Sequence, residues 1–505
     1  MKILIHTMST KKVYTNTIAQ IGGKVITAII SIGLIKILTN YLDISGYGLY
    51  SKIYNYLSIF AVIADLWLYT ITVREISHHK NDKKMVDTII GNVLTLRTIF
   101  GGGIILLSLI IALVLPGYSS LSALIGIFIV SWFTLFGLIN SSIMSLLQAY
   151  LQTEFSLIST TIGKITTFGL IAWTAYWFLP HDTMMQSESG KILGFALVML
   201  AGLMGNMIMT LLTYIYASKI HSIRFRFDKD YIRHILWISL PYGIALFLNV
   251  IFFKIDIILL SILEPKNIAD TSIALYSLPM KIVEVGMMYG TLFLNSMLPL
   301  LTEAIKQNSN EKNILAEKAY RILLLFGFGL ATYLFTYADE VIHLIANKEY
   351  FTNPFWIYTS KDALQVVVWI FFFYFLSSLF TYILIAANEQ RKMMYINSGI
   401  AGVNILGNIL FIPIYSFIGS AYVTVITQIL LLVITYSIAR KYIQIRIITV
   451  FSSLIVSCSL IAYILGTYTS DYFWQSPLSR AIIGIIIFIL CYVPWFYGII
   501  LSHKK

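Results

Sequence analysis

The sequence has few charged residues. Asp, Glu, Lys and Arg make up only 11% of its 505 residues, against roughly 25% in soluble globular proteins. A chain of this length needs far more polar surface to stay dissolved in water. The shortage of charge therefore excludes a water-soluble protein, whether one domain or several.

Cysteine and metal-ligand motifs are also scarce. The two cysteines, Cys458 and Cys491, lie in apolar runs near the C-terminus, which excludes a secreted disulfide scaffold. No pair of Cys or His residues has metal-ligand spacing, and no Gly-rich phosphate loop is present. The sequence predicts no cofactor and no metal site, and it indicates a protein that is not an enzyme.

Long apolar segments are abundant instead. Hydrophobic residues make up 58% of the chain, and the mean hydropathy is +0.83. Apolar runs of about 20 residues, each long enough to cross a hydrocarbon layer roughly 30 Å thick, recur along the whole chain. They predict an all-α polytopic membrane protein with about fourteen transmembrane helices, at 16–40, 49–73, 88–115, 121–147, 154–179, 191–218, 236–263, 272–300, 318–338, 363–386, 393–413, 417–439, 447–468 and 479–501.

Basic residues are divided unequally between the two sides of the predicted membrane. With the N-terminus in the cytoplasm, cytoplasmic segments hold 23 of the 35 Lys and Arg residues, and the outer loops hold five. This bias predicts that both termini are cytoplasmic. It also explains the net charge of +12 without a nucleic-acid partner. The first apolar run has no small-residue cleavage site, so the first helix is expected to be retained.

A short motif recurs in the two halves of the chain. Gly48–Ser51 opens the second span and Ala274–Ser277 opens the eighth, and a similar length of helix follows each. The recurrence favours two copies of a six-helix unit related by an axis along the membrane normal. Chance is the alternative in a chain rich in Leu and Tyr. The predicted parts are two pseudo-symmetric lobes and a C-terminal pair of helices, at 1–220, 221–442 and 443–505.

Ten ionisable residues lie inside the predicted spans. Such residues cost a few kcal/mol at membrane depth, so each should face a cavity, a partner or the interface. All ten are in spans 1, 2, 3, 5, 7 and 8, and seven of them are basic, which leaves an interior charge of +4. The ten are Lys24, Lys36, Lys52, Asp65, Arg97, Lys164, Lys254, Asp256, Lys281 and Glu284.

Polar side chains in four of these helices form narrow stripes. At 100° per residue, spans 1, 2, 5 and 8 each carry a polar face with a lysine in or beside it. This pattern predicts a water-accessible cavity lined by cations. The predicted substrate-binding lysines are Lys24, Lys52, Lys164 and Lys281. The predicted polar lining is Asn16, Gln20, Asn55, Asn249 and Asn295.

The acidic residues Asp65, Asp256 and Glu284 are predicted to be ion-pair partners or coupling-ion sites. Asp256 shares a helix face with Asn249 at seven-residue spacing, which favours an inward orientation. Glu284 follows Lys281 by three residues, so a structural ion pair is the alternative for these two.

Other basic residues also have alternatives. Lys36 and Lys52 lie near span ends, where they can extend their ammonium groups to the interface. Arg97 has no polar stripe around it, which leaves a carboxylate or a backbone carbonyl as its partner. Pro241 and Gly243 in span 7 are predicted to form a hinge, because both residues weaken a helix locally.

Several segments, taken in order, resemble a known family. The chain is similar to Wzx-type polysaccharide transporters of the multidrug/oligosaccharidyl-lipid/polysaccharide flippase superfamily. The resemblance covers most of residues 10–440 and depends on Gly46–Ser51, Ala64–Leu66, Val73–Ile76, Phe253–Asp256, Leu259–Ser261, Tyr276–Ser277, Leu298–Leu300, Ile412–Tyr415 and Ile418–Ala421.

The resemblance implies two MATE-like six-helix lobes around a central cavity. It also implies that the protein flips an undecaprenyl-diphosphate-linked oligosaccharide to the outer leaflet of a bacterial inner membrane, for cell-surface polysaccharides such as O-antigen. The implied partners are this lipid-linked oligosaccharide, membrane lipid and a polysaccharide polymerase. A diphosphate needs cations when it leaves water, which agrees with the basic interior.

Three alternatives stay open. A multidrug or cation antiporter of the same superfamily would need an acidic or apolar cavity, and the excess of lysine is unfavourable for that. A membrane glycan polymerase would need a sizeable outer loop with Arg or His, whereas the outer loops here are short. A lipid II flippase would share both the architecture and the basic cavity.

The predicted topology can be tested with a single engineered cysteine. In a chain without Cys458 and Cys491, a cysteine in the 304–316 loop should react only with reagents that reach the cytoplasmic side. Labelling of intact cells by an impermeant thiol reagent would overturn the topology.

Overall fold

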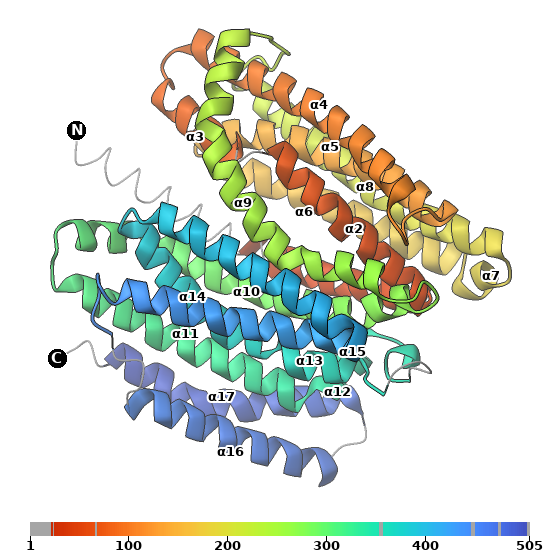
Figure 1. Cartoon of the computed structure of the whole chain (residues 1–505), viewed down its shortest axis with the longest axis vertical. Helices are drawn as coiled ribbons and strands as arrows, with labels where there is room; N and C mark the ends of the chain where they lie inside the picture. The colour runs from red at the N-terminus through yellow and green to blue at the C-terminus, as the bar shows by residue number, and fades with distance from the viewer. Residues whose placement is uncertain are drawn as a thin grey trace. The chain divides into compact units, whose positions relative to one another are not determined.

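The computed structural model describes residues 22–23, 25–65, 68–352, 357–445, 450–472 and 476–501. All the regular elements in these ranges are helices (Figure 1). A helix satisfies the hydrogen bonds of its own backbone, and this is necessary because hydrocarbon offers no other partners. The predicted all-α fold class is confirmed.

The chain divides into two compact units, residues Met1–Lys254 (unit 1) and Ile255–Lys505 (unit 2). The division falls inside one long helix, α9 (Lys229–Leu263). The three-part division at residues 220 and 442 stays a prediction.

Unit 1 is a bundle of long helices. Helices α4, α5 and α8 run side by side, and α6 packs along α8 (Figure 1). Its buried core includes Ile76, Ile89, Leu146 and Ala217, which come from α3, α4, α5 and α8. Besides the first part of α9, its helices are Val25–Tyr41, α2 (Ile44–Asp65), α3 (Leu68–His78), α4 (Lys83–Val114), α5 (Leu121–Ala149), α6 (Thr153–Trp173), the π-helical η1 (Thr174–Phe178), α7 (His181–Met185) and α8 (Glu188–Ser218).

Unit 2 is a second bundle, in which α10, α11, α14 and α15 pack together. Helices α16 and α17 lie side by side against α11 (Figure 1). Besides the last part of α9, its elements are α10 (Ala269–Lys306), α11 (Glu311–Thr336), α12 (Ala338–Ile345), the short 3-10 helix η2 (Lys348–Tyr350), α13 (Ser360–Val367), α14 (Trp369–Ala386), α15 (Gln390–Ala439), α16 (Val450–Tyr472) and α17 (Pro477–Leu501).

The helices agree with the predicted spans. Within the described ranges, nine helices are long and apolar enough to cross a membrane, and three shorter apolar ones begin at Val25, Ser452 and Pro477. Each of the fourteen predicted spans overlaps a helix, because the eleventh and twelfth both fall in α15 and the seventh is in α9.

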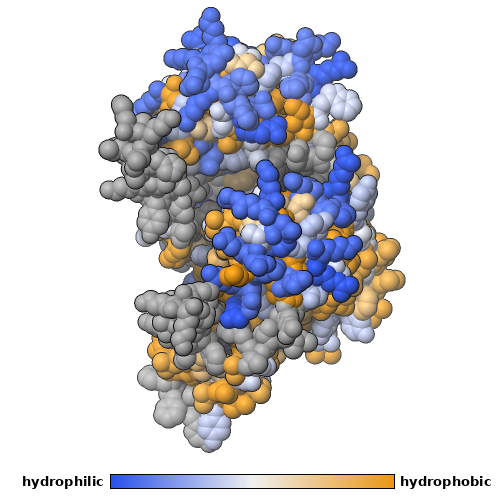
Figure 2. Space-filling view, turned by 90° about the vertical axis from the view of Figure 1, so that its left-hand side faces the viewer, coloured by the Kyte–Doolittle hydropathy of each residue, from blue (hydrophilic) through white to orange (hydrophobic). Residues whose placement is uncertain are grey.

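Apolar side chains cover the flanks of these helices. On α4, Leu106, Ile110 and Leu113 are each at least 60% exposed and follow one another at helical spacing. Such a stripe is costly in water and favourable against lipid tails. Figure 2 looks onto one face of the molecule and shows hydrophilic residues gathered there, with hydrophobic residues along the sides.

Short polar residues fix where several helices begin. Asp82 caps α4 by accepting a hydrogen bond of 3.0 Å from the backbone N–H of Met85. Ser120 caps α5 in the same way through Ala123. These caps satisfy backbone N–H groups that the first turn of a helix leaves without partners.

Glycines allow α6 and α8 to approach closely. A Cβ atom added at Gly163 would lie 2.8 Å from the carbonyl oxygen of Gly205, and one added at Gly205 would lie 2.6 Å from that of Gly163. Small residues at such crossings let backbones pack directly, which is how membrane helices associate. This contact holds α6, and with it Lys164, in place within unit 1.

Helix α15 contains a sharp kink. Ser416 has φ 54° and ψ −142°, so two helices meet there, and Pro413 lies just before. Proline removes a backbone hydrogen bond and bends the chain. The kink brings the two halves of α15, residues 390–415 and 417–439, together around a group of polar side chains.

Candidate functional site

Lys164 connects two helices of unit 1. Its Nζ donates to Ser31 Oγ at 3.0 Å and to the carbonyl oxygen of Thr27 at 3.4 Å. The polar stripes predicted for the first and fifth spans therefore meet. Both oxygens are neutral, and within the described residues no carboxylate forms an ion pair with this half-buried ammonium.

Lys52 is held inside unit 1. Its side chain is only 3% exposed, and Nζ donates to the carbonyl oxygen of Gly117 at 2.8 Å. The ammonium also lies 5.3 Å from the ring centre of Tyr118, within range of a cation–π contact. Gly117 lies in the predicted outer loop between the third and fourth spans, so the interfacial alternative stays open for Lys52. Lys36 is exposed.

Arg97 and Asp65 form an ion pair between α4 and the end of α2. The guanidinium is fully buried and also donates to the carbonyl oxygen of Leu138 and to Ser142 Oγ, both at 3.2 Å. Asp65 is 24% exposed. Arg97 thus has both kinds of partner that the sequence left open, and Asp65 supplies the carboxylate.

Asp256 lies at the centre of a buried network in unit 2. One oxygen accepts from the hydroxyls of Tyr276 at 2.7 Å and Thr424 at 2.8 Å. The other accepts from the side-chain amide of Asn408 at 2.9 Å. Asp256 is 1% exposed. All these donors are neutral, and no basic side chain forms an ion pair with Asp256 in the part of the chain described.

Further polar groups support this network. The Asn408 amide also donates to Asn404 Oδ1 at 3.1 Å, and Ser420 donates to Asn408 Oδ1 at 2.7 Å. These side chains come from both halves of α15. The sequence interpretation missed them because it followed ionisable residues, of which spans 11 and 12 have none. The available signal was two polar pairs at i, i+4 spacing, Asn404 with Asn408 and Ser420 with Thr424.

A second acidic group lies just beyond the network. Glu264 directly follows α9 and is buried, and this burial raises the pKa of its carboxyl. The hydroxyl of the kink residue Ser416 donates to Ser272 Oγ at 3.3 Å, which links the kink of α15 to the start of α10.

Lys281 and Glu284 form an ion pair of 2.7 Å on α10, and both side chains are about one third exposed. Further along α10, Thr291 bonds to Tyr374 at 3.0 Å, and Asn295 accepts from Tyr382 at 2.7 Å. The polar stripe of the eighth span thus meets α14. The structural-pair alternative for Lys281 and Glu284 agrees with this geometry.

The other predicted residues are placed only in part. Asn55 is buried and donates to the carbonyl oxygen of Ser51 at 2.8 Å. Helix α9 runs without interruption through Gly243. Lys24, Asn16 and Gln20 lie outside the described residues, as do the side chains of Asn249 and Pro241.

Two family models match the sequence. One, described as "Polysaccharide biosynthesis protein", matches residues 13–305, and one described as "MatE" matches residues 241–410. A comparison with curated proteins finds no match.

Solved membrane transporters have the same fold. A lipid II flippase, MurJ, in an inward closed conformation has a TM-score of 0.73 at 16% identity, covering 96% of this chain and 100% of that one. An inward-facing multidrug resistance MATE family transporter has a TM-score of 0.67 at 13% identity, covering 84% and 97%. A MOP superfamily transporter from Pyrococcus furiosus has 0.58 at 12%, covering 86% and 96%. At these identities the likeness shows the fold alone.

Replacing either partner of the Arg97–Asp65 ion pair should destabilise unit 1, but by different amounts. Asp65→Ala should lower the free energy of unfolding by about 3 kcal/mol, because it strands a fully buried guanidinium. Arg97→Met should cost less, because the carboxylate that remains is partly exposed. Thermal unfolding of the purified protein in detergent measures both.

Arg74→Met is the matched control, since Arg74 forms an exposed pair with Glu75 that should contribute less than about 1 kcal/mol. If Asp65→Ala unfolds at the wild-type temperature, the buried pair does not stabilise unit 1.

Proposed function

Because this chain belongs to the polysaccharide biosynthesis protein family, we propose that it is a flippase for a polyprenyl-diphosphate-linked oligosaccharide. It would carry this lipid from the inner to the outer leaflet of the bacterial cytoplasmic membrane by alternating access. In this proposal both termini are cytoplasmic, the two lobes comprise residues 1–220 and 221–442, and a polysaccharide polymerase receives the product.

The observation that carries the proposal is the environment of Lys164. Its ammonium lies within a predicted span, and among the described residues it contacts two neutral oxygens, those of Ser31 and Thr27. A cation at membrane depth is stabilised best by an anion. A diphosphate supplies that anion, and its oxygens accept charge-assisted hydrogen bonds from an ammonium. Lys24, Lys52 and Lys281 are the further substrate-binding lysines of the proposal.

The membrane potential would add a driving force. An inside-negative potential favours outward movement of an anion by about 2.3 kcal/mol per charge per 100 mV. If the diphosphate crosses with fewer positive charges than it has negative charges, net negative charge moves outward. An energised membrane would then speed its export.

Unit 2 offers an apolar surface for the polyprenyl chain. A cavity of about 770 Å³ lies between α10, α11, α14 and α17, and Phe293, Phe326 and Ile489 are among its apolar lining residues. A polyprenyl chain is apolar along its whole length, and its burial here would release ordered water or displace lipid tails of similar polarity. The diphosphate and the sugars would then lie outside this apolar cavity, against polar side chains.

Asp256 is the proposed coupling-ion residue. Its donors among the described residues are neutral, and a buried carboxylate held by neutral donors is costly unless a cation binds or the group takes up a proton. Asp65 and Glu284 have basic partners already and are assigned to ion pairs.

The MATE fold also suits a cation or multidrug antiporter, and a lipid II flippase would use the same lysines. Both are outcomes of one assay. Leaflet exchange of a fluorescent polyprenyl-diphosphate oligosaccharide is measured in proteoliposomes, with and without an inside-negative potential, beside efflux of a cationic dye. Exchange that depends on protein and potential supports the flippase. Dye efflux without lipid exchange would favour the antiporter. Exchange of lipid II, but not of the oligosaccharide lipid, would favour a lipid II flippase.

Replacement of the lysines tests the anion site. Lys164→Ala should slow exchange about tenfold, which corresponds to about 1.4 kcal/mol, and Lys24→Ala and Lys281→Ala should also reduce it. Lys164→Arg should retain more activity than Lys164→Ala because it keeps the charge. Lys36→Ala is the matched control and should be nearly silent. All variants should reach the membrane at wild-type levels, and normal exchange by all three Ala variants would refute the basic cavity.

Replacement of Asp256 tests coupling separately. Asp256→Asn should remove the dependence of exchange on an imposed H⁺ or Na⁺ gradient, because a neutral amide cannot compensate a bound cation. The exposed Glu303→Gln is the control and should behave as wild type. A gradient response that survives in Asp256→Asn would place coupling elsewhere.

A further inference from the structure

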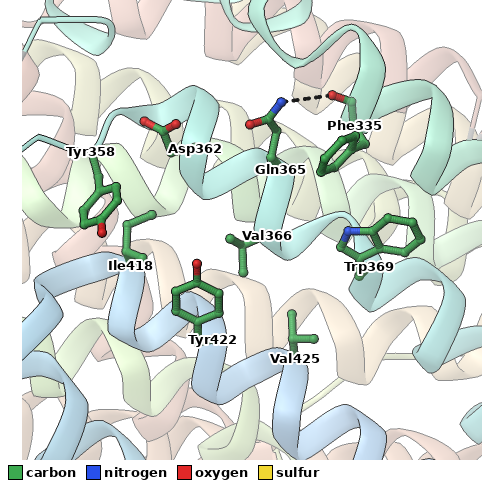
Figure 3. Close-up of a pocket in the computed structure, with 9 residues that line it drawn as sticks. All are labelled: Phe335, Tyr358, Asp362, Gln365, Val366, Trp369, Ile418, Tyr422 and Val425. Carbon is green, nitrogen blue, oxygen red and sulfur yellow. Dashed lines mark hydrogen bonds between the residues drawn. The ribbon is translucent and has the colours of Figure 1, made fainter. Parts of the chain in front are cut away.

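Unit 2 contains a second, smaller pocket of about 400 Å³. Figure 3 shows that it lies where α11 ends, α13 and α14 begin, and the second half of α15 passes. In the predicted topology this end of the unit faces outward. The pocket is lined by Phe335, Tyr358, Asp362, Gln365, Val366, Trp369, Ile418, Tyr422 and Val425.

Aromatic rings form much of the wall. In Figure 3, Tyr358 and Tyr422 border one side of the pocket, and Phe335 and Trp369 border the other. Tyr358 is 39% exposed and Tyr422 is 47% exposed, so both present ring surface to the pocket or to solvent. Rings of this kind bind flat, partly apolar molecules through their faces.

Polar groups with spare hydrogen-bonding capacity lie between these rings. The Gln365 amide donates to the carbonyl oxygen of Phe335 at 3.3 Å, which leaves its own oxygen as an acceptor. Asp362 Oδ2 accepts from the backbone and the hydroxyl of Thr359, which leaves Oδ1. Within the described chain, the indole N–H of Trp369 and the hydroxyl of Tyr422 have no protein partner. The pocket thus offers both donors and acceptors.

This composition distinguishes the pocket from the large apolar cavity between α10 and α17. A lipid tail would leave the amide, the carboxylate and the indole N–H without partners, which is costly. A simple organic cation could pair with the Asp362 carboxylate, but it would leave the indole N–H of Trp369 and the hydroxyl of Tyr422 without acceptors. A sugar ring fits both features, because it carries an apolar C–H face for stacking and hydroxyls at its rim for hydrogen bonds.

The geometry points to a sugar-binding pocket, in which one ring of the transported oligosaccharide stacks on Tyr422 and Trp369 and hydrogen-bonds to Gln365. This inference rests on the proposed function for the identity of the glycan. The pocket holds the sugar at the outer end of unit 2, and the lysines hold the diphosphate. It therefore selects substrates by their glycan, whereas the lysines accept any lipid diphosphate.

Binding of the free glycan tests the pocket directly. The probe is the oligosaccharide that accumulates on lipid in cells lacking this protein, released by mild acid and titrated into the full-length protein in nanodiscs. Tyr422→Ala and Gln365→Ala should each weaken the dissociation constant about fivefold or more, and Tyr422→Phe should stay within about twofold because it keeps the ring. Tyr395→Ala, which removes an exposed tyrosine at the other end of the same helix, should bind as wild type.

The sugar-binding pocket would be overturned if Tyr422→Ala and Tyr395→Ala bound the glycan equally well. It would also be overturned if tetraphenylphosphonium competed with the glycan, or if the wild type did not bind the glycan.

A measurement of leaflet exchange shows whether the pocket or the proposed flippase function is wrong. If Tyr422→Ala moves the oligosaccharide lipid as fast as the wild type does, the pocket fails and the flippase stands. If the wild type exchanges no lipid yet binds the glycan through Tyr422, the flippase fails and the pocket stands.

Discussion

Hydrocarbon offers no hydrogen bonds, and this constraint governs the structure at every level. Backbone groups must be satisfied within the chain, so the described spans are helices. Side chains with charge or polarity must find partners inside the protein, so several of them link one helix to another. Arg97 joins α4 to α2 and α5, and Lys164 joins α6 to the helix Val25–Tyr41.

The same constraint separates residues that stabilise the fold from those available for transport. Arg97 has a carboxylate, a carbonyl and a hydroxyl around it, so its charge is compensated without a ligand. Lys52 is buried against a carbonyl and an aromatic ring between α2 and the turn that joins α4 to α5, and in the proposed function its ammonium would exchange these contacts for the diphosphate. Among the described residues, Lys164 and Asp256 contact neutral groups. They are opposite in charge and lie in different units, and the proposed function gives them different tasks, with Lys164 binding an anion and Asp256 responding to a cation.

Hydropathy was sufficient to predict the helices, because a span must be long and apolar whatever it packs against. It also identified the costly residues, such as Asp65 and Lys164. It was not sufficient to predict their neighbours, since periodicity gives the face of a helix but not the helix opposite. Lys52, for example, bonds to a carbonyl 65 residues away.

The network around Asp256 was missed for a different reason. Neutral side chains such as Asn408 and Thr424 cost little in a membrane helix, so no penalty marks them in the sequence. They meet only because α15 kinks at Ser416, a non-glycine residue with a positive φ that the sequence does not reveal beyond the nearby Pro413. The pocket at Tyr422 depends on the same kink.

The second half of α15 carries two sets of residues on opposite faces. Ser420 and Thr424 point into the Asp256 network, while Ile418, Tyr422 and Val425 line the aromatic pocket. Positions two apart on a helix lie about 160° apart around its axis, so one rigid segment forms both walls. Any tilt or rotation that reshapes the pocket also displaces the hydroxyls around the carboxylate. Related chains can therefore diverge in the pocket only through substitutions that keep the orientation of this segment, which limits how quickly residues 417–425 can change during evolution.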